Sequence, residues 1–277
     1  MNELISLTRS DVLEIRNYEK NDVPIAFYPN LVKKRGNIFL VNKHMDIELL
    51  FITAGEMKIH LDDEVFYAEA GDVVVVNPNV LHNIIPLTET VCYECMIIDR
   101  SFLNTVGMSL DHIYVQEVIK DRGLFAHIYA IKEYLLTNKT GYYAAKVYCH
   151  IIECVLILLE KYVKAKQENR AESSGLLSIE KAVSYIHEHF NKAITVEEIA
   201  AHIGYSKFYF CRRFKEITGY TVATYINMQR IKYAHNMLVE SDKNINEIAF
   251  ECGFASVAYF SATFKRYMGI SPSQVKK

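Results

Sequence analysis

The chain has 277 residues, which is long for one domain and typical of two, and 51% of them are hydrophobic, enough to fill two cores. Its net charge of −2 hides an asymmetry. The residues from Leu176 onward hold 13 Lys and Arg against 9 Asp and Glu, and the rest of the chain is acidic. A basic tail on an acidic body is typical of a modular nucleic-acid-binding protein. The most apolar run, residues 151–159, is too short to cross a bilayer, which argues against a membrane protein.

The six cysteines are not spaced like a disulfide framework, and four of them lie in stretches that we expect to be helical. Cys92 and Cys95 lie in an apparent strand, where residues three apart point to opposite faces, so we do not expect a zinc or redox pair. Unpaired thiols and a polar N-terminus without a signal peptide predict a cytoplasmic protein.

The first 35 residues are polar with short apolar pieces and predict an irregular arm. The arm ends in the basic triplet Lys33-Lys34-Arg35, which we expect to be a solvated loop. From Ile38 to Ile98 the hydrophobic pattern has a period of two and is interrupted by turn residues. Seven short strands without a helix between them predict a jelly roll or small barrel. The expected strands are 38–41, 48–54, 57–61, 65–68, 73–77, 82–85 and 90–98.

Polar residues recur at fixed spacings in this segment. The first group reads His44-x3-Glu48-x6-Gly55, and it resembles the first motif of cupin barrels, with Asn42 where that motif has its leading histidine. Cupin barrels serve as effector-binding domains in a family of transcription regulators.

The second group runs from Gly71 to Pro78-x3-His82 and resembles the second cupin motif. Asn79 stands where that motif usually has glycine. Asparagine tolerates a left-handed backbone better than most residues, so the turn can persist.

The resemblance implies that Asn42, His44, Glu48 and His82 meet inside the barrel. Imidazole and carboxylate groups could bind Zn, Mn or Fe(II), so a metal-dependent enzyme such as a dioxygenase or isomerase is one interpretation. The other is a polar cavity that hydrogen-bonds a ligand. Because Asn42 replaces a potential ligand, we favour a pocket for a small-molecule effector of the sugar type, without a cofactor. Aromatic residues such as Phe51, Phe66 and Tyr67 are candidates to line it.

After Leu110 the pattern becomes helical. Leu124, Phe125, Ile128, Ile131 and Leu135 form one stripe, closed by Asn138 and Gly141. Residues 142–166 predict a longer helix that is apolar around most of its circumference. Such a helix must be covered on several sides, either by its own chain or by a second protomer, and we expect a homodimer.

Residues 164–174 have the polar composition of a linker. We therefore predict an effector-binding and dimerisation domain at 1–166, a linker at 167–175 and a second domain at 176–277. In the second domain, Ile179, Ala182, Val183, Ile186 and Phe190 predict an amphipathic helix.

One supersecondary unit occurs twice after this helix, at 194–215 and 245–265. The two copies match at an offset of 49 and, after the turn, of 50, which is hard to obtain by chance. In the first copy Thr195 and Glu198 form a potential capping box, Gly204 suits a turn with positive φ, and Ser206 can cap a second helix. This order of cap, helix, glycine turn and second capped helix is typical of a helix-turn-helix.

The second helix of the first copy buries Phe210 and Phe214 and leaves a cationic face exposed. Entry into a DNA major groove requires such a face, because phosphates dominate affinity and base edges need donors. In the second copy, Thr263 is a further candidate for a phosphate contact. The predicted DNA-binding residues are Ser206, Lys207, Phe208, Cys211, Arg212, Arg213, Lys215, Ser256, Val257, Ala258, Ser261, Ala262 and Lys265.

The last hundred residues resemble the DNA-binding domain of AraC/XylS-type transcription regulators. The resemblance covers both helix-turn-helix units, the connecting helix (Tyr225-Ile226, Arg230-Ile231, Ala234, Leu238) and the closing Gly-x-Ser-Pro at 269–272. It implies that Phe208, Cys211 and Arg212 face bases in the first unit, and that Val257, Ala258 and Ala262 do so in the second.

The second unit departs from the family pattern, because Ala262 stands where the family often has arginine. Small apolar groups can touch thymine methyls but cannot hydrogen-bond a base edge. We therefore predict that the first unit supplies most of the sequence discrimination and the second mainly anchors.

The predicted fold is α+β: a cupin-like barrel with a helical dimerisation segment, followed by an all-α domain with two helix-turn-helix motifs. The predicted function is a transcription regulator, an activator in our interpretation, whose partners are double-stranded DNA, a small-molecule effector and RNA polymerase. A metal-dependent cupin enzyme with secondary DNA binding is the alternative, and a protein-interaction adaptor is disfavoured by Arg212 and Arg213.

Overall fold

The computed structural model describes residues 23–35, 40–137, 142–164 and 174–276. The chain forms two compact units, which we call the β unit (described residues 23–35, 41–137 and 142–164) and the helical unit (described residues 174–276). In the described ranges, no helix combines the length and hydropathy that a membrane span requires.

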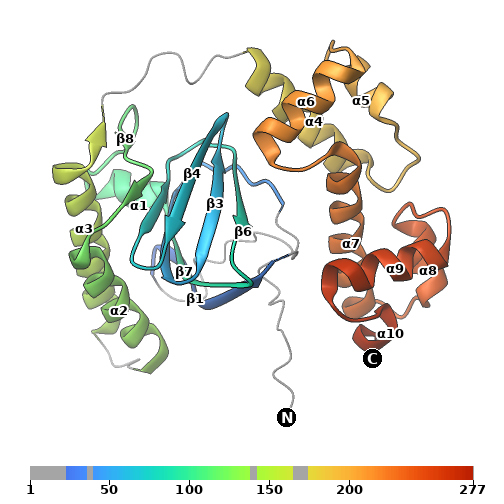
Figure 1. The fold of residues 1–277 in the computed structure, drawn as a ribbon. Coiled ribbons are helices and arrows are strands. Elements are labelled where there is room, and N and C mark those ends of the chain that lie inside the picture. The colour runs from blue at the N-terminus through green and yellow to red at the C-terminus, as the bar shows by residue number, and fades with distance from the viewer. Residues whose placement is uncertain (1–22, 36–39, 138–141, 165–173, 277) are drawn as a thin grey trace. The chain divides into compact units, whose positions relative to one another are not determined.

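The β unit contains two antiparallel sheets that face each other (Figure 1). The larger has the order β1-β7-β2-β5-β9, the smaller has the order β4-β3-β6, and β8 pairs separately with β10. This is the β-rich domain that the sequence predicts. The strands are β1 Ile25–Lys34, β2 Ile47–Ala54, β3 Glu56–Leu61, β4 Glu64–Glu69, β5 Val73–Val76, β6 His82–Pro86, β7 Thr90–Ile98, β8 Tyr114–Val115, β9 Val118–Ile119 and β10 Val163–Lys164.

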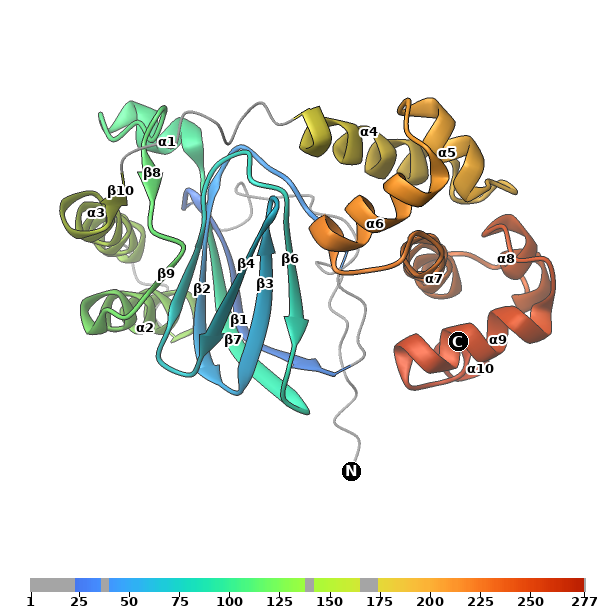
Figure 2. The same ribbon diagram turned by 45° about the horizontal axis from the view of Figure 1, so that its top comes forward.

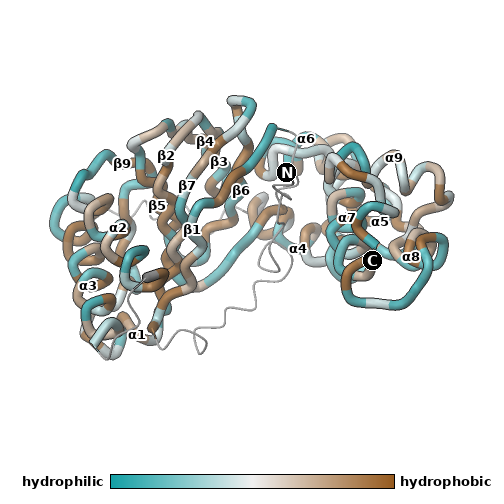
Figure 3. Tube along the Cα trace, turned by 90° about the horizontal axis from the view of Figure 1, so that it is seen from below, coloured by the Kyte–Doolittle hydropathy of each residue, from teal (hydrophilic) through white to brown (hydrophobic). Residues whose placement is uncertain are grey.

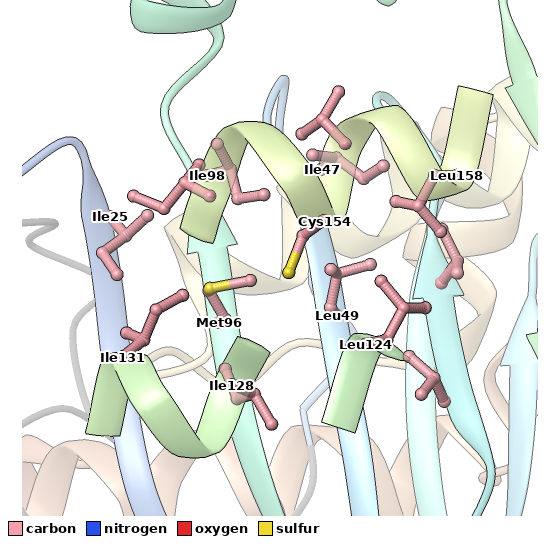
Figure 4. Packing of buried hydrophobic residues seen from close by; sticks show 14 of the residues in the cluster. Ile25, Ile47, Leu49, Met96, Ile98, Leu124, Ile128, Ile131, Cys154 and Leu158 are labelled. Atoms are coloured by element: carbon pink, nitrogen blue, oxygen red, sulfur yellow. The ribbon is translucent and has the colours of Figure 1, made fainter. Parts of the chain in front are cut away.

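Two hydrophobic clusters lie on opposite faces of the larger sheet. Alternate residues of β2, such as Leu50 and Ile52, face the smaller sheet, while Leu49 and Phe51 face the opposite way. The outward face is covered by α2, Arg122–Thr137, and α3, Tyr143–Lys161 (Figure 4). The four consecutive valines of β5 are buried on both sides and form a hydrophobic run in Figure 3.

Strand β1 corrects the prediction of an irregular arm. It pairs with β7 from Ile25 to Lys34, and Lys33 is buried rather than part of a solvated loop. The sequence hid this strand because Pro29-Asn30 in its middle reads as a turn. In the structure Asn30 has φ of 55°, the register shifts between Tyr28 and Leu31, and the strand continues past this bulge.

Other departures are smaller. The expected strand 38–41 lies partly outside the described residues, and its described part, Leu40 and Val41, is not in a strand. A short helix that we did not expect, α1 Arg100–Thr105, is capped by Asp99. The long helix α3 ends at Lys161 instead of 166 and is followed by β10. The expected closing residues Asn138 and Gly141 lie outside the described residues.

The helical unit contains both predicted helix-turn-helix motifs. Its helices are α4 Ser174–His189, α5 Val196–His202, α6 Lys207–Thr218, α7 Val222–Glu240, α8 Ile245–Glu251, α9 Val257–Met268 and α10 Pro272–Val275. Helices α5 and α6 form the first motif, α8 and α9 form the second, and α7 connects them (Figure 2). As predicted, α4 packs on the first motif with Ile179, Ala182, Val183 and Ile186 buried.

The two turns have the same backbone but different surroundings. Gly204 and Gly253 have φ of 74° and 83°, in the left-handed region that favours glycine. The space beside Gly204 is open, whereas a Cβ on Gly253 would lie 2.7 Å from the carbonyl oxygen of Asn191. The segment around Asn191 is also held by Arg230 of α7, whose guanidinium donates to the carbonyls of Phe190 and Lys192. The second turn is therefore packed against backbone and the first is not.

Candidate functional sites

Three of the four predicted effector residues meet in the β unit. His44 lies just before β2, Glu48 lies on β2, and His82 begins β6. The loop before β2 is drawn to β6 because Asn42 and His82 exchange two backbone hydrogen bonds of 2.9 and 2.8 Å. The backbone N–H of Asn79 also donates to the carbonyl of His44, at 2.7 Å. Asn42 thus sets the register through its backbone, and the other three side chains are buried together.

The two imidazole rings converge on a single carboxylate oxygen. Nε2 of His44 lies 3.0 Å from Oε2 of Glu48, and Nε2 of His82 lies 3.2 Å from the same oxygen. The rings meet edge to face, with their centroids 4.9 Å apart. Burial alone would raise the pKa of Glu48, but hydrogen bonds and charge from His44 and His82 hold that pKa well below its usual value. Glu48 is therefore ionised at neutral pH.

Neighbouring groups fix the orientation of these three side chains. Nδ1 of His44 lies 2.8 Å from the carbonyl oxygen of Asp46, and Nδ1 of His82 lies 3.0 Å from that of Val80. On the other side of the carboxylate, the thiol of Cys95 donates to Oε1 of Glu48, at 3.2 Å.

Cys95 was not predicted as part of this site, because in the sequence it stands out only as a partner of Cys92. The signal that could have found it is the period of β7. Cys95 shares its face with Tyr93 and Ile97, which point toward the smaller sheet, as Glu48 does on the adjacent strand β2.

The three aromatic residues that we expected to line the effector cavity lie in different places. Phe51 packs against Phe125 of α2, on the face of the sheet turned away from His44 and His82, and Tyr67 is 66% exposed. Only Phe66 of the three packs against the cluster between the sheets.

A surface pocket lies elsewhere on the β unit, beside α2. It combines cationic Lys120 and Arg122 with aromatic Phe125 and Tyr129. Lys120 already pairs with Glu69 at 2.8 Å and Asp72 at 3.6 Å, so part of its charge is neutralised. This pocket is a second place where a small molecule could bind.

In the first helix-turn-helix motif, the first candidate DNA-binding site, both helices begin at the caps that the sequence predicts. Thr195 and Glu198 form a reciprocal capping box at the start of α5, and Ser206 caps α6 by accepting from the N–H of Tyr209. Phe210 and Phe214 are fully buried and anchor α6. The same arrangement recurs in the second motif, where Asn244 and Glu247 form the box and Ser256 caps α9.

The outer face of α6 is cationic and accessible. The side chains of Lys207 and Arg212 are 59% and 58% exposed, and Phe208 is 82% exposed. Lys215 is also exposed, while Cys211 and Arg213 are half-buried.

Three cations of this face pair with exposed acids of the same unit. Lys207 lies 2.5 Å from Glu197, Arg213 lies 2.8 Å from Glu216, and Arg212 lies 3.8 Å from Glu216. Exposed pairs of this kind contribute little, about 0–1 kcal/mol, so a phosphate or a base edge can replace them.

The outer face of α9 is mostly small and neutral. Ala258, Ala262 and Lys265 are exposed, as is the cap Ser256, while Val257 and Ser261 are half-buried. Thr263 is only 2% exposed and packs inside the unit, so the expectation that it reaches a phosphate is wrong. Thr263 directly follows the exposed Ala262, and this step of one residue along the helix turns its side chain from the outer face to the core.

The chain matches known families and proteins over both units. A sequence model of the AraC-like ligand binding domain matches residues 30–145, and a model of a helix-turn-helix domain matches residues 199–277. YdeC of Bacillus subtilis, described as an uncharacterized HTH-type transcriptional regulator, is 23% identical over 283 residues, which cover 95% of each chain.

Other similarities are partial or distant. The melibiose operon regulatory protein of Escherichia coli is 31% identical over 110 residues, which are 40% of this chain and 36% of that protein. Among solved structures, ToxT from Vibrio cholerae is similar over 91% of this chain and 97% of its own, with 14% identity and a TM-score of 0.45.

Proposed function

Because the chain belongs to the AraC family of DNA-binding transcription regulators, we propose that it switches transcription in response to a small molecule held by the β unit. The observation that carries this proposal is the duplicated helix-turn-helix with an exposed cationic α6. The family and the relatives are regulators, so the metal-dependent enzyme is not the function of this chain. Within the proposal, activation would involve contact with RNA polymerase on the same DNA.

Selection of bound DNA from a random library by the full-length protein tests this function. We expect one sequence to be enriched strongly, because base contacts from α6 add discrimination to the electrostatic affinity that any basic surface has. Recovery of DNA without a common sequence would contradict the proposal.

We further propose that the effector is a carbohydrate bound at His44, Glu48 and His82. Converging polar groups inside a β-rich unit suit a ligand with several hydroxyls. The melibiose operon regulatory protein, by its name, regulates a sugar operon. A thermal-shift screen of sugars should give a stabilising ligand whose effect disappears in His82→Ala and persists in Arg122→Ala. The reverse result would move the effector to the pocket beside α2.

A chain of buried hydrogen bonds supports a route from this site to the end of the β unit. The turn before His82 begins at Asn77, whose side-chain amide donates to the carbonyl of Val115 and accepts from its N–H, both at 2.8 Å. Val115 belongs to β8, which pairs with β10, the last described element before the predicted linker at 167–175. Lys164 of β10 is also tied to the buried Glu117, at 2.5 Å. Movement of the turn on ligand binding would therefore reach β10.

Asn77→Ala tests this route. The substitution removes both hydrogen bonds to Val115, and we expect it to cost about 1–3 kcal/mol of stability and to abolish the change in operator affinity that the effector produces. DNA binding without effector should persist. Thr88→Ala is the control, since it removes a side-chain bond to the N–H of Glu56 at 3.1 Å, away from the route. If Asn77→Ala responded to the effector like the wild type, the route would be wrong.

We also propose that the chain forms a homodimer through α3. One side of this helix is covered by its own chain, with Val147, Ile151 and Leu158 fully buried. The other side leaves Ile152 and Leu156 half-buried and Cys149 exposed. Sedimentation of the full-length protein at micromolar concentration should give a dimer, and Ile152→Glu should give a monomer. A wild-type monomer would remove the proposal. We also propose the domain limits 1–166, 167–175 and 176–277, as the sequence predicts them.

A further inference from the structure

We infer that Arg230 of α7 fixes the orientation of the two helix-turn-helix motifs relative to each other, and with it the two stretches of DNA that one chain can contact at once. It does so by holding the turn after α4, residues 190–192, against the second motif. Arg230 is a positioning residue, because it acts through this turn and not through contact with DNA. The consequence for DNA binding rests on the proposed function, and the consequence for the helical unit does not.

Helix α4 packs on the first motif along its length. Its first turn lies beside α6, where a Cβ on Gly175 would be 3.5 Å from Nη2 of Arg213. Further along, apolar residues such as Ile179 and Ile186 are buried, and the helix packs on both α5 and α6. Residues 190–192 directly follow α4, so their position is set by the first motif.

Helix α7 connects the two motifs. Its second half belongs to the core of the second motif, where Ile231, Ala234 and Leu238 are buried with residues of α8 and α9. Its first half packs on the first motif, where the rings of Tyr225 and Phe214 meet edge to face with centroids 5.4 Å apart. A helix of 19 residues is about 28 Å long, and helices of such length curve. Joined by α7 alone, the two motifs could bend and twist relative to each other.

Residues 190–192 supply a second connection between the motifs. The guanidinium of Arg230 donates from Nε to the carbonyl oxygen of Phe190 at 2.7 Å, and from Nη2 to that of Lys192 at 2.9 Å. The same guanidinium lies over the ring of Phe254, 5.7 Å from its centroid, and Phe254 is buried in the second motif. Two connections at different places oppose a rotation that one connection would allow.

Between these two carbonyls, the backbone of Asn191 lies directly against the turn of the second motif. A Cβ on Gly253 would be 2.7 Å from the carbonyl oxygen of Asn191, so glycine permits this close approach. The side chain of Phe190 adds an edge-to-face contact with Tyr233 of α7, with ring centroids 5.2 Å apart. All three residues of the turn therefore touch α7 or the second motif.

Arginine combines the groups that this connection requires. Its planar guanidinium carries five N–H donors in a fixed arrangement, so one side chain can bond two carbonyls of the same turn. Both carbonyls follow the end of α4, where the helix dipole favours a positive charge. Methionine would fill part of the same half-buried space but has neither charge nor donor.

Distance measurements between α6 and α9 test the inference without DNA or effector. Spin labels are attached at the exposed, equivalent positions Lys215 and Lys265, through non-natural residues that leave the cysteines in place. The labelled full-length protein is diluted with unlabelled protein, so that labels on a second chain do not contribute. We expect one narrow distance in the wild type and its loss in Arg230→Met. Lys181→Met, which removes an exposed cation of α4, is the matched control and should keep the narrow distance.

Footprinting on the selected DNA gives a second measurement. In Arg230→Met, we expect the patch contacted by the first motif to stay protected and the other patch to lose protection. Affinity should fall by about 10-fold, because the second motif is no longer held in the orientation that binds. If Arg230 only stabilised the helical unit, both patches would weaken together and the folded protein would keep its narrow distance. Arg230→Lys keeps the charge without the planar guanidinium, so its effects should be intermediate.

The same narrow distance in the wild type and in folded Arg230→Met would overturn the inference. A broad distribution in the wild type would overturn it as well, since no fixed orientation would exist. Should Arg230→Met fail to fold, the comparison of the wild type with Arg230→Lys decides in the same way. If library selection enriches no sequence while the distances change as expected, the proposed function falls and the role of Arg230 in the helical unit stands.

Discussion

Gly253→Ala is expected to destabilise the helical unit by about 3 kcal/mol, while Gly204→Ala, the equivalent change in the first motif, should cost about 1 kcal/mol. Both residues have positive φ, so each alanine has the backbone strain of a left-handed residue. Only the Cβ at position 253 would also collide with backbone, 2.7 Å from the oxygen and 2.9 Å from the carbonyl carbon of Asn191. Backbone cannot move aside as the end of a long side chain can.

Denaturant unfolding of the two variants measures this difference. Gly204→Ala is the control for Gly253→Ala, because the substitution is the same at both turns. DNA binding at room temperature should be weakened in Gly253→Ala and nearly unchanged in Gly204→Ala. Equal losses of stability would show that the strain of positive φ, rather than the contact with Asn191, decides the effect.

Arg212→Ala is expected to relax base preference by about 5- to 150-fold, the equivalent of the roughly 1–3 kcal/mol that a bidentate arginine–guanine contact contributes. The guanidinium lies on the exposed face of α6, 5.6 Å above the ring of Tyr209 and loosely paired with Glu216 at 3.8 Å, so little holds it away from DNA. Competition between the preferred site and its single-base variants measures this change.

Ala262→Ser, on the exposed face of α9, is the matched substitution in the second motif. It should leave base preference almost unchanged, because a methyl-sized group makes no hydrogen bond that would be lost. If both variants lost the same discrimination, the division of labour between the two motifs would be incorrect.

The helical unit was predictable because its signals are local. A capping box, a glycine at the turn and two phenylalanines four residues apart each act within one or two turns of helix, and all appear twice. The error at Thr263 arose where the sequence pattern left its face open and packing against the rest of the unit decided its burial.

The β unit was harder to predict because strand pairing depends on distant residues. The pattern of β1 is broken by Pro29-Asn30, and what keeps it in the sheet is nonlocal: Glu94 accepts from the N–H of Asn30 at 2.7 Å and pairs with Lys132 of α2 at 2.5 Å. Strands of two residues, such as β8 and β10, give no period at all. His44, Glu48 and His82 were found through the resemblance to the cupin motifs, but Cys95 could be joined to them only by the register of β2 against β7.

Footprinting of the full-length protein on its selected DNA tests the central claim most directly, that one chain presents two helix-turn-helix motifs to one duplex. The account predicts two protected patches per chain on the same face of the DNA, centred about one helical turn, roughly 10 base pairs, apart. Arg212→Ala should alter recognition within one patch only. A single protected patch per chain, or two on opposite faces, would contradict the account.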